Sequence, residues 1–207
     1  MRETPESQSH HAYVLLEHLI VTLKLKPGAL VNERQLIILT GHGRTPVREA
    51  IQKLAWQGLI FVHPRVGLKI AEINTEDHAQ IMEVRRELEP IAAALAAKHA
   101  GAEHRRRLHD CAQTMASCAV NGDVDGFLAA DRTFDEIMVE ACPNTFLTTA
   151  LSPLQTHSRR LWFAAATPER MDVSIGLHVG VIRAVQQGDV AGARKAMVAL
   201  MDYLSPT

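Results

Sequence analysis

The sequence predicts a mostly α-helical protein with a front part that contains one short β-hairpin and a rear part of about six antiparallel helices. Three observations favour this fold class. Apolar residues recur at helical spacing through much of the 207 residues. Two β-prone runs flank a Pro/Gly turn at residues 63–67. After Asn74 the strand-like runs stop, and the abundant Ala, Leu and Val are typical of closely packed helices.

Two short helices separated by a glycine turn are predicted in the front part. Asn32 and Gln35 suit a capping box at the start of the first helix. Gly41-His42-Gly43 supplies a tight turn, and the second helix is expected to begin with Thr45 as its N-cap and Pro46 at its first position. This is helix–turn–helix spacing.

The second helix has one apolar face and one cationic face. Its apolar residues recur at i, i+3, i+4 and i+7, at Val47, Ala50, Ile51 and Leu54. Arg44, Thr45, Arg48 and Gln52 fall off this stripe and can face outward. Arginines near the N-terminus of such a helix suit the floor of a DNA major groove. The alternative is an ordinary amphipathic helix with a solvated basic face.

A hairpin is predicted directly after this helix, which ends near Gln57-Gly58. Residues 59–62 and 68–73 are its two β-prone runs. A hairpin in this position is a wing, and Arg65 at its tip could reach a phosphate or the minor groove.

The charge distribution agrees with a DNA-reading front part. The whole chain has a net charge of −1, but residues 1–73 carry nine Lys/Arg and six Asp/Glu, a balance of +3. The remainder carries 13 basic and 17 acidic residues, a balance of −4. A head with a charge of +3 is weakly cationic, so we expect a homodimer that places two heads on one two-fold DNA site.

Composition limits the class of protein further. Hydrophobic residues make up 47% and charged residues 22%, which is ordinary for a globular chain of two modest domains. There is no apolar run of membrane-spanning length, and residues 1–11 lack the apolar core of a signal peptide. Three cysteines without a ligand spacing suit a reducing compartment. We therefore expect a cytoplasmic protein with no membrane partner.

In the rear part, capping residues and breakers mark the helix boundaries. The expected helices cover about 75–100, 102–120, 124–142, 145–166, 168–187 and 190–204. Asp123, Asn144 and Asp189 are the expected N-caps of the third, fourth and sixth of these helices, and Thr167-Pro168-Glu169 is expected to start the fifth.

Three polar residues of the rear part fall on apolar stripes. Asp131 and Asp135 project into the apolar arc of the third helix of this part, and His178 lies on the apolar stripe of the fifth. Burying two like charges is costly, so a metal, an arginine or a bound ligand should face them. Two carboxylates and one imidazole resemble a facial metal triad. The alternatives are a solvated Asp pair and a hydrogen-bonded core histidine.

The front part resembles the winged helix–turn–helix of GntR-type transcription regulators. The resemblance covers residues 20–73 and rests on Pro27-Gly28, Leu30, Glu33-Arg34, Leu36, residues 44–50, Leu54, Gly58-Leu59 and Gly67. It implies DNA contacts by Arg34, Arg44, Thr45 and Arg48, and wing contacts around Arg65 and Gly67. His42 and Gly43 depart from the family, which usually has a small apolar residue and Ser there.

The rear part resembles the FCD-type effector domain of the same regulators. The resemblance covers residues 75–204 and rests on Arg85-x-x-Leu88-Glu89, Asp131-Arg132-Thr133-Phe134, Pro143-Asn144, His178, Ala184, Gly188-Asp189 and Ala193. It implies a metal held by one Asp and three His. Asp131 and His178 match, whereas Asp135 and Leu200 stand in the places of two histidines.

These departures leave two interpretations of the pocket. Asp135 would shift a divalent metal site toward Mg²⁺ or Mn²⁺, or the metal has been lost and the effector supplies the charge. His157, Arg159 and Arg160 could also compensate the carboxylates. Arg85 would suit a carboxylate effector. The alternative role of Arg85 is an i, i+4 ion pair with Glu89.

The sequence therefore predicts a ligand-responsive transcription regulator, and the resemblance favours a repressor. Residues 8–73 would bind a double-stranded operator, and residues 75–204 would dimerise and bind a small metabolite, by resemblance an organic acid. One alternative is a metal-dependent enzyme centred on Asp131, Asp135 and His178. Another is a constitutive DNA-binding protein whose effector pocket has decayed.

Overall fold

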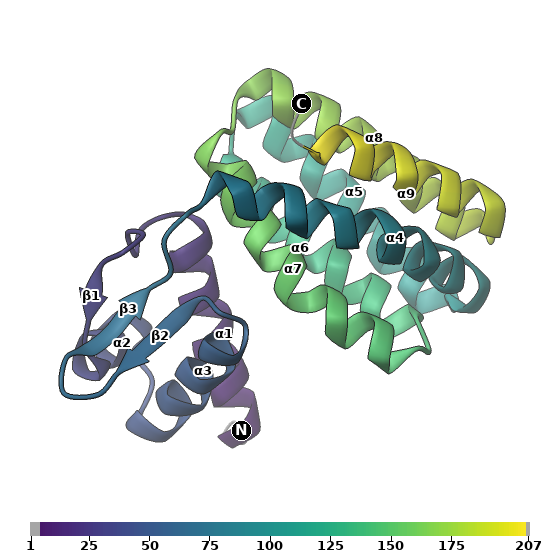
Figure 1. Ribbon diagram of the computed structural model, residues 1–207. Helices are drawn as coiled ribbons and strands as arrows, with labels where there is room; N and C mark the ends of the chain where they lie inside the picture. Colours follow the sequence, from purple (N-terminus) through teal and green to yellow (C-terminus); the bar gives the residue numbers. More distant parts are fainter. Residues whose placement is uncertain (1–4, 206–207) are drawn as a thin grey trace. The chain divides into compact units, whose positions relative to one another are not determined.

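The computed structural model describes residues 5–205, which divide into two compact units between Asn74 and Thr75 (Figure 1). The front unit contains three helices and three strands. These are α1 (Pro5–Val21), β1 (Leu30–Val31), α2 (Glu33–Thr40), α3 (Arg44–Trp56), β2 (Ile60–His63) and β3 (Gly67–Ile70). The predicted fold class is confirmed for this unit, but neither α1 nor β1 was predicted.

Helices α2 and α3 form the expected helix–turn–helix. The Asn32–Gln35 capping box is present, and Gly41 ends α2 with a left-handed φ of 68°. The prediction for the start of α3 was wrong, because the N-cap is Gly43 and Arg44 is the first helical residue. Pro46 is tolerated at the third position because the first N–H groups of any helix have no partner inside it.

The three strands form an antiparallel sheet in the order β1-β3-β2. The loop between β2 and β3 is the predicted wing, and Arg65 at its tip has a φ of 66°. Strand β3 stops at Ile70, before the predicted end of the second β-prone run at residue 73. Leu16, Ile20, Val47 and Leu54 belong to the core that holds α1 and α3 together.

The rear unit is the predicted bundle of six helices. They are α4 (Thr75–His99), α5 (Ala102–Asn121), α6 (Val124–Ala141), α7 (Thr145–Ala164), α8 (Pro168–Gln187) and α9 (Val190–Leu204). The predicted N-caps Asp123, Asn144 and Asp189, and also Thr167 at the start of α8, each accept a hydrogen bond from the backbone N–H three residues later. Helix α9 packs against both α4 and α8, and α5 packs against α6 (Figure 1).

Within residues 5–205 no helix has the length and apolar character that a membrane crossing requires. All three cysteines, Cys111, Cys118 and Cys142, are buried free thiols.

Candidate functional site

The outer face of α3 has the composition that the sequence predicts. Arg44, Thr45, Arg48 and Gln52 are exposed, whereas Val47, Ala50, Ile51 and Leu54 are buried. The apolar stripe thus fixes the helix to the front unit and leaves two guanidinium groups and a hydroxyl on one open face near the helix N-terminus. This geometry suits contacts with phosphates and base edges.

Glu33 on α2 holds both arginines of that face. Nε of Arg48 donates to Glu33 Oε2 over 2.8 Å, and Nε of Arg44 lies 3.4 Å from Glu33 Oε1. Exposed pairs of this kind add little to stability. Their effect is to restrict the rotamers of two arginines in the absence of DNA. No local pattern in the sequence indicates this role of Glu33, because it depends on how α2 crosses α3.

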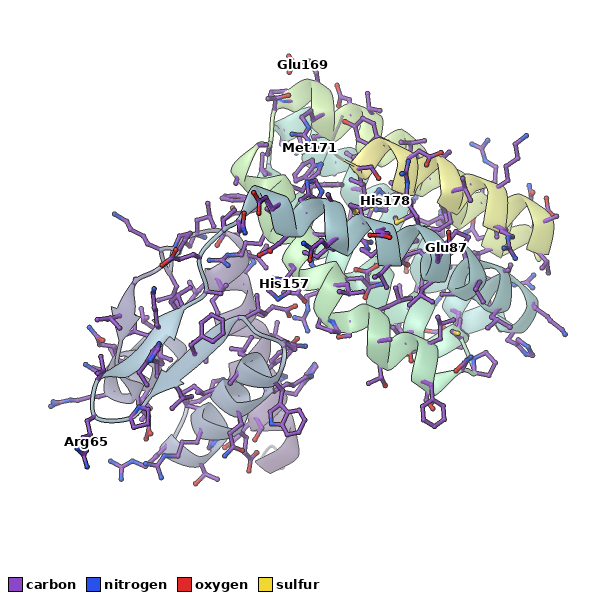
Figure 2. The ribbon with its side chains drawn as sticks, viewed as in Figure 1. Arg65, Glu87, His157, Glu169, Met171 and His178 are labelled. Atoms are coloured by element: carbon purple, nitrogen blue, oxygen red, sulfur yellow. The ribbon has the colours of Figure 1, made fainter. Side chains whose placement is uncertain are left out.

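The other predicted DNA-contact residues lie in α2 and the wing. Arg34 is exposed on α2, and Arg65 projects outward from the tip of the β2–β3 loop (Figure 2). Gly67 has a φ of 129°, and a Cβ atom there would lie 3.0 Å from the carbonyl oxygen of Val31. The glycine is therefore required by backbone conformation and by the close approach of β1.

The rear unit contains a small cavity among α4, α6, α7, α8 and α9, with both charged and apolar side chains in its lining. Its free volume is about 20 Å³. That volume accommodates about one water and no metabolite. The lining includes the predicted pocket residues Arg85, Asp131, Asp135, His178 and Leu200, together with Glu89, Gln155, Arg159, Trp162 and Ser174.

His178, which is labelled in Figure 2, lies between two oxygen atoms of the protein. Its Nε2 lies 2.9 Å from Oδ1 of Asp131, and its Nδ1 lies 2.8 Å from the carbonyl oxygen of Ser174. A carboxylate and a carbonyl oxygen accept hydrogen bonds, so this geometry favours the ring with a proton on each nitrogen, an imidazolium. The ring edges of Phe127 and Phe134 enclose it.

Arg159 is the cationic group that faces the aspartate pair. Its Nη1 forms an ion pair with Oδ2 of Asp135 and lies 3.6 Å from Oδ2 of Asp131. Arg159 and Asp135 are both buried. The requirement for a facing cation is thus met by an arginine, and the alternative of a solvated Asp pair was wrong. His157 and Arg160, which the sequence also offered, do not line the cavity.

Arg85 is paired within its own helix. Nε and Nη2 of Arg85 donate to Oε1 of Glu89 over 3.0 and 2.8 Å, and Nε2 of Gln155 donates to the same oxygen over 3.2 Å. The i, i+4 ion pair between Arg85 and Glu89, the alternative role of Arg85 predicted from the sequence, is therefore present, and it is buried.

The surroundings shift three pKa values. Burial and the neighbouring Asp131 raise the pKa of Asp135 to about 7 even though Arg159 favours its ionised form. Burial alone would raise the pKa of Asp131, but the hydrogen bond from His178 and the nearby cations hold it below 3.8. Burial disfavours the charged form of His178, yet its hydrogen bond to Asp131 keeps its pKa above 6.5.

The divalent metal that the family resemblance implies does not fit these residues. An imidazolium that donates from both nitrogens has no lone pair for a metal. The two carboxylates already face Arg159, and Leu200, in the place of the last histidine, is a buried apolar side chain. No group of three or more His, Cys, Asp or Glu in the described part of the chain could hold a metal ion.

Among the lining residues, the sequence leaves Arg159 as one of three choices and does not single out Gln155, Trp162 or Ser174. One signal could have found Gln155 and Arg159. Leu151, Gln155, Arg159 and Trp162 follow one another at spacings of four, four and three, so they share one face of α7. A glutamine and an arginine on an apolar stripe indicate a buried polar network.

Comparisons with known proteins agree for both units. Residues 8–70 match the model of the gntR family of bacterial regulatory proteins, and residues 80–203 match the FCD domain. A probable D-xylose utilization operon transcriptional repressor of Paenarthrobacter nicotinovorans is 29% identical over 84% of this chain and 76% of its own. The transcriptional repressor RspR of Escherichia coli is 22% identical over 93% of this chain and 85% of its own.

A solved structure has the same fold. The E. coli protein McbR/YncC superimposes with a TM-score of 0.79 at 22% sequence identity, covering 95% of this chain and 94% of that one.

Proposed function

Because the chain belongs to the GntR family of bacterial DNA-binding transcription regulators and carries an FCD domain, we propose that it is a ligand-responsive repressor. The family membership makes it a regulator and not an enzyme, which removes the alternative of a metal-dependent hydrolase or lyase.

One observation carries the proposal for the DNA contacts. Helix α3 buries its apolar stripe and leaves Arg44, Thr45 and Arg48 on an open face. Arg34 and Arg65 are exposed on α2 and on the wing, where they suit phosphate contacts. Two such heads in a homodimer would match a two-fold operator. Repression is supported by two relatives that are described as repressors.

The ligand proposed is an organic acid that binds in the cavity of the rear unit. Arg85 and Arg159 are cations that line it, and guanidinium groups bind carboxylates with two parallel hydrogen bonds. Nε1 of Trp162 is a buried donor without an acceptor among the described residues, and it could serve a ligand oxygen. Since the free space holds about one water, the acid must displace the internal partners Glu89 or Asp135.

The small volume also favours a second candidate, constitutive DNA binding with a closed pocket. The two candidates are separated by titrating the protein with a panel of mono- and dicarboxylates while following its thermal midpoint. Each acid that raises the midpoint is then added to a fluorescence-anisotropy titration of a duplex from the DNA flanking the gene. Ligand control predicts a change in operator affinity of about 5- to 150-fold. Constitutive binding predicts no change with any acid.

A further inference from the structure

We propose that the guanidinium of Arg159 takes the place of a metal ion in the cavity of the rear unit. The buried carboxylates of Asp131 and Asp135 are thereby kept in the fold without a bound cation.

The position of Arg159 supports this role. It reaches from α7 to two carboxylates on α6, forming an ion pair with Asp135 and lying 3.6 Å from Asp131. Its Nη2 also donates to Oγ1 of Thr156 over 3.2 Å, which fixes the plane of the guanidinium. A buried charge is retained only where it is paired and hydrogen-bonded, and this side chain meets both conditions.

The two carboxylates of the cluster have partners without a metal. Arg159 lies beside both carboxylates, and Nε2 of His178 lies 2.9 Å from Oδ1 of Asp131, so protein groups already face the two aspartates. The nearby Arg85 is neutralised by Glu89. A divalent ion would therefore add two positive charges beside Arg159 in a region of low dielectric, where repulsion is strong.

The residues in the places of the family's metal ligands are also not available to bind a metal. Both nitrogens of His178 already face oxygen atoms, at 2.9 Å to Asp131 and 2.8 Å to Ser174. Leu200 is a buried apolar side chain that offers no ligand atom. Metal binding would thus require His178 to leave its two oxygen partners, Arg159 to move away from both carboxylates, and another ligand to take the place of Leu200.

Under the proposed function, on which this point rests, the same guanidinium determines how an acidic ligand is recognised. An acidic ligand would meet a planar guanidinium with fixed N–H directions instead of a metal with open coordination positions. The test below uses metal ions alone, so its outcome does not depend on whether any ligand or operator is found.

The first arm uses the full-length wild-type chain. Its metal content is measured by mass spectrometry, and its thermal midpoint is followed with EDTA and with added Zn²⁺, Ni²⁺, Mn²⁺ or Mg²⁺. We expect far less than one metal ion per chain and the same midpoint in every condition. Stoichiometric metal that survives dialysis, together with a midpoint that EDTA lowers and Zn²⁺ or Mn²⁺ restores, would overturn the proposal.

The second arm removes the guanidinium. Arg159→Met leaves two buried carboxylates opposed by one imidazolium, so we expect the midpoint to fall by roughly 10 °C. Added Mn²⁺ or Mg²⁺ should restore part of that loss. Arg159→Met/Asp135→Asn should recover stability without any response to metal. A matched control is Arg86→Met, which removes an exposed interhelical pair with Asp202 and should give no metal response.

An Arg159→Met variant as stable as the wild type would contradict the proposed role, because the carboxylates would then not need the guanidinium. If this variant does not fold, the wild-type arm decides the question, since it requires no substitution.

Discussion

Nε2 of His178 on α8 donates a hydrogen bond over 2.9 Å to Oδ1 of Asp131 on α6, and these are the two residues that match the family's metal ligands. In this chain they bind each other. The pair joins two helices through an imidazolium and a carboxylate, so its loss should affect both the titration of His178 and the stability of the bundle.

Replacing Asp131 with Asn should lower the pKa of His178 from above 6.5 to below it. The substitution removes the negative charge that opposes the effect of burial on the imidazolium. The measurement is an NMR titration of the His178 ring in the wild type and in Asp131→Asn. An unchanged pKa would show that Asp131 does not hold the proton on His178. The exposed Asp202→Asn on α9 is the matched control and should leave the titration of His178 unchanged.

The thermal stability of the chain should fall as the pH rises from about 5 to 7. Between pH 3.8 and about pH 7 the folded chain keeps a proton on Asp135 that the unfolded chain has released. Above pH 6.5 the folded chain likewise keeps a proton on His178 that the unfolded chain has released. In both ranges the folded state binds more protons, so the free energy of unfolding decreases with rising pH.

Asp135→Asn is the variant that tests the assignment of this pH dependence. It should flatten the dependence of the midpoint between pH 5 and 7, while Asp202→Asn should keep the wild-type slope. Differential scanning fluorimetry across this range measures both. A wild-type slope in Asp135→Asn would show that Asp135 ionises at its ordinary pH in the folded chain.

Local signals predicted most of the fold, because capping residues and apolar stripes act over a few positions. The N-caps Asp123, Asn144, Thr167 and Asp189 all lie where the sequence places them. Strand β1 could not be predicted in this way, since its two residues form a strand only by pairing with β3. Helix α1 was missed because its polar start hides the spacing of Ala12, Leu16 and Ile20, which are buried.

The partners within the cavity depend on tertiary packing. The sequence indicates that a cation must face Asp131 and Asp135, but it offers His157, Arg159 and Arg160 equally. The choice follows from how α7 is rotated against α6, which no local pattern fixes. The same limit applies to Glu33, whose contact with Arg48 spans two helices.

Replacing Arg48 with Ala should weaken operator binding by about 1–3 kcal/mol if the side chain contacts a base edge. If it contacts a phosphate, the slope of log affinity against log salt should flatten by about one unit. Anisotropy titrations at several salt concentrations distinguish the two contacts. Arg86→Ala removes an exposed arginine from α4 of the rear unit and should leave both quantities unchanged. Wild-type affinity and slope in Arg48→Ala would argue against the assignment of α3 as the reading helix.

Replacing Glu33 with Gln should raise the affinity for non-operator DNA and lower discrimination in favour of the operator. The variant loses a negative charge near the duplex and releases Arg44 and Arg48 from their ion pairs. Glu49→Gln on α3 is the control. It makes the same change of net charge, but Glu49 accepts a hydrogen bond from Oγ of Ser9 instead of pairing with an arginine. Equal discrimination in the two variants would mean that Glu33 acts only through its charge.

The most direct test of the account is to sequence the genomic DNA fragments that the purified full-length chain retains. Wild-type protein should enrich fragments that share a two-fold symmetric sequence, and the Arg44→Ala/Arg48→Ala variant should lose that enrichment while keeping the wild-type thermal midpoint. Retention of the same fragments by both proteins, or no enrichment by the wild type, would contradict the claim that the exposed face of α3 reads an operator.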